Sequence, residues 1–443
     1  MRSADDAWSG RLGFILAAIG SAIGLGNIWR FAYVAGENGG AAFLLVYALC
    51  VLLIGMPVLM SEFVLGQRGR GGLLKAFTGP AGVRGWTVAG ALAMLVAFLI
   101  LSYYAVIAGW ATRYFWFYLT GELAALPREA VPAAFEAFIA DPREPVLWHA
   151  AFMAVTTAIV LVGVARGIER ASRVLMPVLA MMVILLAGYA LSLPGAAKGV
   201  RFLLAPDWSA LRMPGLYVAA LGQAFFSLGV SMGVMIVYAG YMRSRAGFGS
   251  ATLAVALSDT MFAIVVGLAI FPIVFAFGLD PAHGATLAFI TLPQAFAMMP
   301  AGPWLGTAFF FLLTAAALTS AVSLLEVPVS ALRGAGLPRS VAALATALLA
   351  FAVGVPSALG WSLLADVQIV GKNVLEAVDY LASSVLLPLV GLAVVLYVGW
   401  ILPRDEVLRA SGLNARIGAV WIAMVRYVAP LAMLVFLATS AMG

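Results

Sequence analysis

The sequence predicts an all-α integral membrane protein with about eleven transmembrane helices. Of its 443 residues, 64% are apolar and only 10% are charged. A soluble globular domain is nearer to about half apolar and about a quarter charged. Apolar runs of about 20 residues, the length that crosses a bilayer as a helix, recur along the whole chain and favour helices over a β-barrel.

We expect one transmembrane domain over residues 1–443, with no separate soluble domain. The predicted spans lie near residues 11–36, 41–67, 86–120, 146–164, 170–193, 215–242, 247–279, 303–332, 338–355, 373–402 and 414–441. The opening stretch MRSADDAWSG lacks the basic start and short apolar core of a cleavable signal peptide, so we expect none.

The distribution of basic residues predicts the orientation. Most of the 25 lysines and arginines fall at the N-terminus and in loops after even-numbered spans, which predicts a cytoplasmic N-terminus. An odd number of spans then puts the C-terminus outside the cell. The acidic segment 121–145 suits an external loop, whereas the basic loop 194–214 departs from the rule. The net charge of +6 therefore reflects membrane topology, and no nucleic-acid partner is expected.

Two spans are interrupted by glycine-rich stretches. The first carries SAIGLGN at residues 21–27, and the sixth carries FFSLGVSMG at residues 225–233. Each opens a block of five spans, which suggests an inverted repeat of 11–193 against 215–402, followed by an extra helix at 414–441. A broken helix leaves backbone N–H and C=O groups without hydrogen bonds in lipid, and each such group costs several kcal/mol. A bound cation or carboxylate can satisfy them. A structural kink is the alternative interpretation.

Oxygen-bearing side chains gather near both interruptions. Asn27, Ser227 and Asp259 lie in apolar surroundings, and the stretch ALTS places Thr319 and Ser320 in the eighth span. Hard oxygen donors favour an alkali cation over a transition metal. Asp259 is the sharpest candidate, because a lone carboxylate inside a membrane is expensive and marks an ion path. The hydroxyls have an alternative role, which is to bond back to their own helix backbone.

Five stretches carry a resemblance to a known family. They read WSGRLGFILAAIGSAIGLGNIWRF, GENGGAAF, GQAFFSLGVSMG, LSDTMFAIVVGLAIFP and LTSAVSLLEV. They resemble the neurotransmitter:sodium symporter family, and within it the bacterial amino-acid transporters. The resemblance implies the leucine-transporter fold, a standard example of an inverted repeat whose first and sixth helices are unwound at the midplane.

The resemblance also implies two sodium sites. The first would use the Ala22 carbonyl with Asn27, Ser227, Asp259 and the carboxylate of the substrate. The second would use the carbonyls of Gly20, Ile23 and Ala316 with the hydroxyls of Thr319 and Ser320. Because Ala263 stands one turn beyond Asp259, this carboxylate would also supply the fixed negative charge that replaces chloride, and no chloride requirement is expected.

The implied substrate site lies between the interruptions. Its residues would be Ser21, Ala22, Gly24, Gly26, Ile100, Tyr104, Phe226, Ser227, Gly229, Ser231, Met232, Ser323 and Leu324. Tyr104 would bond the substrate carboxylate. Gly24 stands where monoamine carriers have an aspartate, which favours an amino acid over a monoamine. The apolar members favour an apolar side chain, and Ser231 in place of a frequent glycine favours a smaller one.

The same resemblance implies an outer gate. Arg30 and Asp379 would pair across it, and Tyr104 and Phe226 would close over the substrate. An ordinary interfacial ion pair is the alternative for Arg30 and Asp379.

The inner gate departs from the family pattern. Its expected residues are Asp5, Trp8, Tyr241 and Arg333. Asp5 stands where an arginine is usual, and Gly334 stands where an aspartate is usual, so the usual salt bridge cannot form. We interpret Asp5 or Asp6 with Arg333 as a reversed pair. Such a surface pair is worth at most about 1 kcal/mol.

The fifth span begins with GIERASRVLMP, in which Gly167 lies ten residues before Pro177. This spacing matches a family device that unwinds the cytoplasmic end of the fifth helix and lets water reach the second sodium site. The alternative is that the glycine ends a loop and the proline relaxes a helix.

The sequence therefore predicts a sodium-coupled symporter that imports a small or apolar amino acid by alternating access. We expect a multi-pass protein of the bacterial cytoplasmic membrane, with sodium and an amino acid as partners. Alternatives are a carrier of another carboxylated solute, a proton-coupled carrier through Asp259, and a channel or sensor on the same scaffold. An enzyme is not expected, because no nucleophile–base pair, metal cluster or nucleotide motif is visible.

Overall fold

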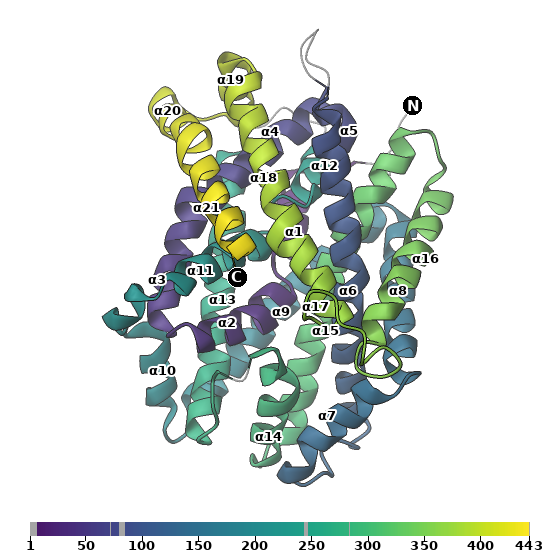
Figure 1. Cartoon of the computed structure of the whole chain (residues 1–443), viewed down its shortest axis with the longest axis vertical. Coiled ribbons are helices and arrows are strands. Elements are labelled where there is room, and N and C mark those ends of the chain that lie inside the picture. The colour runs from purple at the N-terminus through teal and green to yellow at the C-terminus, as the bar shows by residue number, and fades with distance from the viewer. Residues whose placement is uncertain (1–6, 71, 79–84, 243–246, 283, 443) are drawn as a thin grey trace.

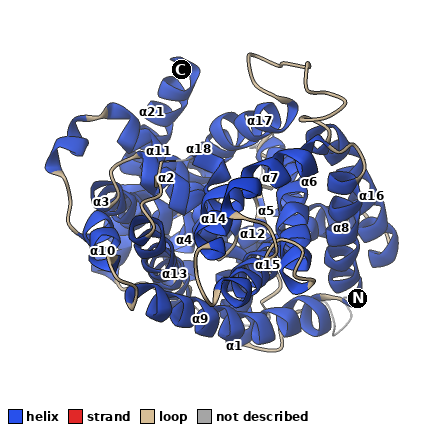
Figure 2. Cartoon of the chain, turned by 90° about the horizontal axis from the view of Figure 1, so that it is seen from below, coloured by secondary structure: helices blue, strands red, loops and turns tan. Residues whose placement is uncertain are grey.

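Helices account for the regular structure of the chain. The computed structural model describes residues 7–70, 72–78, 85–242, 247–282 and 284–442. Within these ranges there is no β-strand, and the only β-type pairing is an isolated bridge between Ile369 and Lys372. Figure 2 shows the helices packed side by side without a sheet. The predicted all-α class is confirmed.

The α-helices are labelled as in Figure 1. They are α1 (Arg11–Ala22), α2 (Phe31–Glu37), α3 (Ala41–Cys50), α4 (Met56–Gly69), α5 (Leu73–Ala76), α6 (Thr87–Leu119), α7 (Val131–Ala140), α8 (Glu144–Val162), α9 (Arg170–Leu191), α10 (Ala196–Leu204), α11 (Pro214–Ser227), α12 (Val234–Gly240), α13 (Gly249–Ala276), α14 (Leu292–Ala297), α15 (Gly302–Gly334), α16 (Arg339–Ala358), α17 (Val374–Asp379), α18 (Leu387–Leu396), α19 (Arg404–Ser411), α20 (Ala415–Ala423) and α21 (Ala429–Met442). Wider π-helical turns follow or join several of them, at Gly26–Arg30, Val51–Gly55, Val164–Glu169, Leu287–Thr291, Tyr380–Leu386, Tyr397–Ile401 and Met424–Val428.

In the described part of the chain, nine helices are long and apolar enough to cross a membrane. They run over Ala41–Gly69, Thr87–Leu119, Glu144–Val162, Val164–Leu191, Gly249–Ala276, Gly302–Gly334, Arg339–Ala358, Val374–Ile401 and Ala415–Ser440. The pair Arg11–Ala22 and Gly26–Glu37, bent by 46°, makes a tenth. The predicted span near 215–242 corresponds to the short helices α11 and α12. The count of eleven and the orientation of the termini remain predictions.

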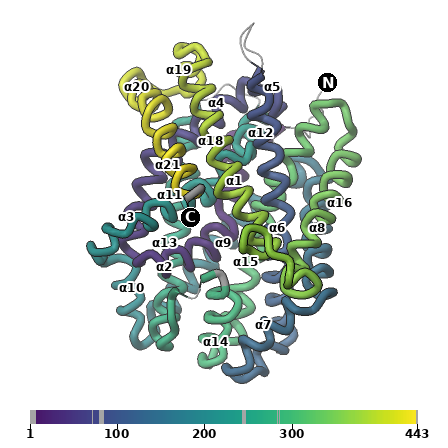
Figure 3. The backbone as a smooth tube through the Cα atoms, in the orientation of Figure 1, coloured from purple at the N-terminus to yellow at the C-terminus, as the bar shows by residue number. Residues whose placement is uncertain are grey.

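Both predicted interruptions are present. Helix α1 ends at Ala22, the backbone is extended at Ile23, and helical structure resumes at Gly26. Between α11 and α12 the backbone is left-handed at Gly229, Ser231 and Gly233, with φ of +61°, +67° and +74°. Glycine adopts this conformation freely, whereas another residue pays about 1–2 kcal/mol. Figure 3 shows α1, α2, α11 and α12 around the middle of the molecule.

The two longer segments between spans are helical. Residues 194–214 contain α10 and a 3₁₀ turn at Trp208–Arg212, and residues 280–302 contain α14 and two short turns. In Figure 1, α7, α10 and α14 lie at the end of the molecule opposite α5 and α19. Gly199 of α10 approaches α13 so closely that a Cβ would lie 2.4 Å from the Pro272 nitrogen. This segment is therefore packed against the bundle.

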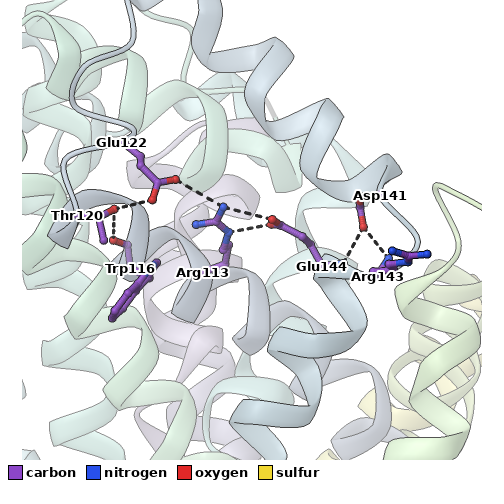
Figure 4. Close-up of polar contacts among 7 residues, drawn as sticks. All are labelled: Arg113, Trp116, Thr120, Glu122, Asp141, Arg143 and Glu144. Carbon is purple, nitrogen blue, oxygen red and sulfur yellow. Dashed lines mark hydrogen bonds and ion pairs between the residues drawn. The ribbon is translucent and has the colours of Figure 1, made fainter.

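An ion-pair cluster holds the acidic segment 121–145 against α6 (Figure 4). Arg113 of α6 donates from Nε to Glu144 Oε2 at 2.9 Å, and its Nη2 lies 3.8 Å from Glu122 Oε2. Asp141 Oδ1 accepts the backbone N–H groups of Arg143 and Glu144 at 2.7 and 2.8 Å. These bonds lower the pKa of the Asp141 carboxyl. The carboxylate thereby caps the start of α8.

Candidate functional site

A small cavity lies between the two interruptions. Its volume is about 30 Å³, enough for about one or two water molecules. It is lined by Ser21, Ala22, Gly24, Gly26, Ile100, Tyr104, Phe226, Gly229, Met232, Val234, Ser320, Ser323 and Leu324. All the predicted substrate-site residues line it except Ser227 and Ser231. The structure thus brings together side chains from the first, third, sixth and eighth predicted spans.

Glycines in the first interruption allow this close approach. A Cβ on Gly24 would lie 2.3 Å from Ser320 Oγ and 2.8 Å from the Tyr104 hydroxyl, and a Cβ on Gly26 would lie 3.0 Å from the Phe226 ring. Real Cβ contacts essentially never fall below 3.0 Å. The freed backbone is bonded to α6, since the amide of Leu25 donates to the Tyr104 hydroxyl at 3.1 Å.

Beside the cavity, Asn27, Ser227 and Asp259 form one buried polar cluster. Asn27 Nδ2 donates to Asp259 Oδ1 at 2.7 Å and to Ser227 Oγ at 3.0 Å. Ser227 Oγ in turn donates to the carboxylate at 2.7 and 2.8 Å. Asn27 Oδ1 also accepts the Gly24 amide at 3.2 Å, which ties the cluster to the first interruption. All three predicted side chains are buried and in mutual contact.

Tyr47 of α3 belongs to the same cluster and was not predicted. Its hydroxyl donates to Asp259 Oδ2 at 3.0 Å and lies 3.1 Å from Ser227 Oγ. The carboxylate is thus contacted by the Asn27 amide N–H and two hydroxyls. Its own oxygens and the hydroxyl oxygens are the hard donors that suit an alkali cation. The sequence feature that could have identified Tyr47 is its hydroxyl, the one polar side-chain group in the apolar run AAFLLVYALC apart from the Cys50 thiol.

A second group of oxygens faces the end of α1. Thr319 Oγ1 donates to the Ala316 carbonyl at 2.8 Å and lies 3.5 Å from the Ile23 carbonyl. Ser320 Oγ donates across to the Ser21 carbonyl at 3.0 Å. The alternative role of bonding to the parent helix is therefore seen for Thr319 but not for Ser320.

Gly20, the remaining residue of the predicted second set, lies on α1 against α9. A Cβ on it would be 3.4 Å from the side chains of Ser172 and Met176. The predicted second set therefore gathers where α1, α9 and α15 meet.

Ser231 lies outside the cavity. Its amide donates to Glu62 Oε1 at 2.6 Å, and a Cβ on Gly391 of α18 would lie 2.6 Å from its Oγ. Ser231 in place of a glycine predicts a smaller substrate side chain, and the cavity lining does not support that prediction. Glu62 is fully buried and was not predicted, although a lone carboxylate within the second span is the same signal that singled out Asp259.

The two charged residues of the predicted outer gate have different partners. Arg30 Cζ lies 4.6 Å from the centre of the Phe226 ring, a cation–π contact. Asp379 instead accepts from the Tyr103 hydroxyl at 2.7 Å and from Ser383 Oγ at 2.8 Å. Arg30 and Asp379, both described, form no direct ion pair here. Tyr103, next to the predicted Tyr104, was not predicted.

At the opposite end, Trp8 packs under α12. Its Nε1 donates to the Tyr238 carbonyl at 2.7 Å, and its ring centre lies 6.3 Å from that of Tyr241. Asp5 and Asp6 fall outside the described residues, so their pairing with Arg333 stays a prediction.

The structure adds a buried ion pair at this end. Arg339 Nη2 lies 2.5 Å from Glu326 Oε2, and Tyr241 donates to Glu326 Oε1 at 2.6 Å. Glu326 is fully buried. This pair joins α15, α16 and the end of α12, which the sequence did not predict.

The predicted unwinding region of the fifth span contacts the start of α1. Gly167 lies in the π-helical turn Val164–Glu169, and Pro177 lies inside α9. Glu169 accepts from the Ser9 amide at 2.9 Å and from the Ser9 hydroxyl, and it pairs with Arg173 at 2.6 Å. The buried Glu169 thereby holds the chain just before α1.

Comparison with known proteins shows which family this chain belongs to. The profile of the sodium:neurotransmitter symporter family matches residues 5–128 and 140–443. The chain belongs to this family. It is 36% identical to the sodium-dependent transporter YhdH of Bacillus subtilis, over 97% of this chain and 96% of that one. It is 32% identical to a sodium-dependent transporter of Haemophilus influenzae, over 97% and 96% of the two chains.

A solved structure is similar over nearly the whole symporter. The crystal structure of MhsT in complex with L-phenylalanine has a TM-score of 0.93 and 47% identity, covering 98% of this chain and 99% of that one. The predicted family and the leucine-transporter fold are confirmed. The protein is a multi-pass membrane transporter of a sodium-coupled family, and that family consists of transporters rather than enzymes.

Proposed function

We propose that this symporter imports an apolar amino acid together with sodium, by alternating access across the bacterial cytoplasmic membrane. The observation that carries the proposal is the lining of the cavity, which combines the interrupted backbone of the first span and Tyr104 with apolar side chains. An amino acid has the same division between a charged head and a side chain.

The polar side of the cavity suits a carboxylate. Gly24 leaves no side chain in the space between Ser320 and Tyr104. Backbone amides at the N-terminal end of a half-helix attract negative charge, because that end carries a partial positive charge. An aspartate at position 24 would repel a carboxylate at this place, so glycine supports an amino acid over a monoamine.

The other side suits an apolar side chain. Ile100, Phe226, Met232, Val234 and Leu324 are the larger apolar residues that line the cavity. MhsT, which is similar over 98% of this chain, binds L-phenylalanine in its crystal structure. A cavity of about 30 Å³ is too small for an amino acid, so its walls must move apart when substrate enters. We therefore propose apolar side chains in general, aromatic ones included.

We further propose two sodium sites in the arrangement implied by the resemblance. The first uses Asn27, Ser227, Asp259 and the Ala22 carbonyl, and the second uses Thr319 and Ser320 with the carbonyls of Gly20, Ile23 and Ala316. The hydrogen-bonded cluster around Asp259 supports the first, and the hydroxyls facing the end of α1 support the second.

We also expect transport that does not require chloride, and the same cluster supports this. Asp259 places one fixed negative charge beside the first sodium site, while Ala263 one turn on is neutral. A fixed carboxylate at this position can replace a bound chloride ion, because either one compensates the positive charge of sodium.

Thermal unfolding of the purified protein with each common amino acid, in sodium and in potassium, tests the proposal. We expect a higher melting temperature with a few apolar amino acids in sodium only. Uptake of the same amino acids into proteoliposomes should then proceed equally in sodium chloride and sodium gluconate. No shift with any amino acid would exclude the proposed substrate class, and uptake driven by a pH gradient without sodium would favour proton coupling.

A further inference from the structure

A second pocket opens between the end of α4 and the chain around α19. Its volume is about 520 Å³, and it is lined by Val64, Gln67, Arg68, Arg70, Leu402, Glu406, Val407, Arg409 and Ala410. None of these residues lines the substrate cavity. In Figure 1, α4, α5 and α19 lie at the same end of the molecule, the end predicted to be cytoplasmic.

Buried hydrogen-bond donors in this pocket lack partners. Gln67 Nε2 and Arg68 Nη1 are both shielded from solvent and have no hydrogen-bond partner. Arg68 Nη1 lies 3.8 Å from Glu406 Oε1, beyond hydrogen-bond reach. Both atoms can only donate. An unsatisfied buried donor is costly, so the pocket is matched to a ligand rich in acceptors.

Two further arginines add positive charge at the mouth. Arg70 and Arg409 are exposed, and neither has an ion pair within the described ranges. Arg409 uses Nε to bond the Asp405 carbonyl of its own helix at 3.2 Å, which leaves its terminal nitrogens for another group. Three arginines against the single carboxylate of Glu406 give the pocket a formal charge of +2.

Tyr397 fixes the adjoining wall. Its ring lies 5.5 Å from that of Phe77 and 5.2 Å from that of Trp86, so the chain after α4 is packed onto the end of the tenth predicted span. Its buried hydroxyl also lacks a hydrogen-bond partner. These ring contacts pack the chain that follows α4 against the span that leads into the pocket at Leu402.

We propose that this pocket binds a phosphate group. Arginine forks recognise phosphate oxygens with paired, charge-assisted hydrogen bonds, and several acceptors on one group can satisfy Gln67 and Arg68 at once. A volume of 520 Å³ leaves room for a substituent on the phosphate. The group can come from an anionic phospholipid headgroup or from free phosphate, and the inference is independent of which solute the symporter carries.

Thermal unfolding of the full-length protein distinguishes the two sources. One arm adds inorganic phosphate to protein in detergent against sodium chloride of equal ionic strength. The other compares nanodiscs of phosphatidylcholine with and without phosphatidylglycerol. The test variant is Arg70→Gln with Arg409→Gln, because both side chains are exposed and dispensable for packing. The matched control is Arg416→Gln, an exposed arginine on α20 that does not line the pocket.

We expect stabilisation of the wild type and of Arg416→Gln in at least one arm, with binding about tenfold or more weaker in the double variant. Stabilisation by inorganic phosphate assigns free phosphate, and stabilisation by phosphatidylglycerol alone assigns the lipid headgroup. The proposal is overturned if neither probe stabilises the wild type, or if Arg416→Gln loses as much as the double variant.

Discussion

At the scale of single residues, the hydroxyl of Tyr47 is the least expected part of the Asp259 cluster. It holds Asp259 Oδ2 at 3.0 Å and contacts Ser227. A hydrogen bond to a charged group is worth about 1.5–3 kcal/mol. Tyr47→Phe should therefore raise the sodium concentration for half-maximal stabilisation about tenfold or more, because the carboxylate loses a partner that positions it.

The matched control for this change is Tyr217→Phe. Tyr217 is exposed and its hydroxyl bonds only the Leu211 carbonyl, so sodium dependence should not change. Equal sodium dependence of the Tyr47→Phe variant and the wild type would show that the hydroxyl does not support the proposed first sodium site.

Gly24 supplies a second residue-level prediction. A Cβ there would lie 2.3 Å from Ser320 Oγ and 2.8 Å from the Tyr104 hydroxyl, so Gly24→Ala must displace both. We expect a folded protein whose melting temperature no longer rises with the amino acid that stabilises the wild type. Gly188→Ala on α9 is the control, since a Cβ there meets nothing within 4 Å, and its substrate response should be retained.

The polar site residues that could be identified without the family resemblance share one property, a polar group alone in an apolar run. Asn27 and Asp259 stand out in this way, and the structure places them in contact. Glu62 carries the same signal and was overlooked. The partners of Tyr103 and Glu169 could not be predicted, because they depend on which helices pack together and not on any local pattern.

At the scale of elements, the interruptions were predictable because glycines mark them and a bilayer penalises an unpaired backbone. The helix ends agreed with the predicted spans to within a few residues, except that π-helical turns extend or join several helices. The fifth span begins earlier than predicted, at Val164, because the turn Val164–Glu169 continues into α9. A single wide turn leaves no mark on apolar periodicity, so the sequence does not reveal it.

The contact between that turn and α1 carries a prediction. Glu169 accepts from the Ser9 amide and hydroxyl just before α1, and it lies so close to the first turn that a Cβ on Gly13 would be 2.2 Å from Glu169 Oε1. Glu169→Gln should weaken these charge-assisted bonds and speed amide hydrogen exchange in residues 9–22 by about tenfold. Hydrogen exchange measured by mass spectrometry reads this directly.

Arg173→Gln is the comparison, because it keeps both bonds from Ser9 to Glu169 and removes only the 49% exposed Arg173 side chain, with its bond to the Ser9 hydroxyl at 2.8 Å. It should change exchange less than Glu169→Gln does. If the two variants exchange alike, or if α1 exchanges at the wild-type rate in Glu169→Gln, then Glu169 does not hold the start of α1.

At the scale of the whole molecule, the fold was predictable from long matching stretches, and MhsT confirms it with a TM-score of 0.93. What closes the end that carries Trp8 was not predictable. A pair between Asp5 and Arg333 in place of the missing salt bridge stays a prediction, because Asp5 lies outside the described residues. The buried pair of Glu326 and Arg339 is an additional ion pair at this end, and it depends on the packing of α15 against α16.

The burial of this pair predicts a large effect on the whole molecule. Glu326 is fully buried and the Arg339 side chain is only 14% exposed. Removing one partner of a buried pair leaves an uncompensated charge and costs about 3–5 kcal/mol, whereas a surface pair is worth about 1 kcal/mol or less. Arg339→Gln should therefore lower the melting temperature and uptake far more than the exposed-site change Arg416→Gln.

A double-variant cycle separates loss of the pair from loss of either side chain. Glu326→Gln with Arg339→Gln removes both charges, so its melting temperature should lie above that of Arg339→Gln alone, since no buried charge is left unpaired. Additive losses in the double variant would mean that the two groups do not act as a pair. In that case the closure of this end would rest on Trp8 beneath α12, and Trp8→Ala would be the more damaging change.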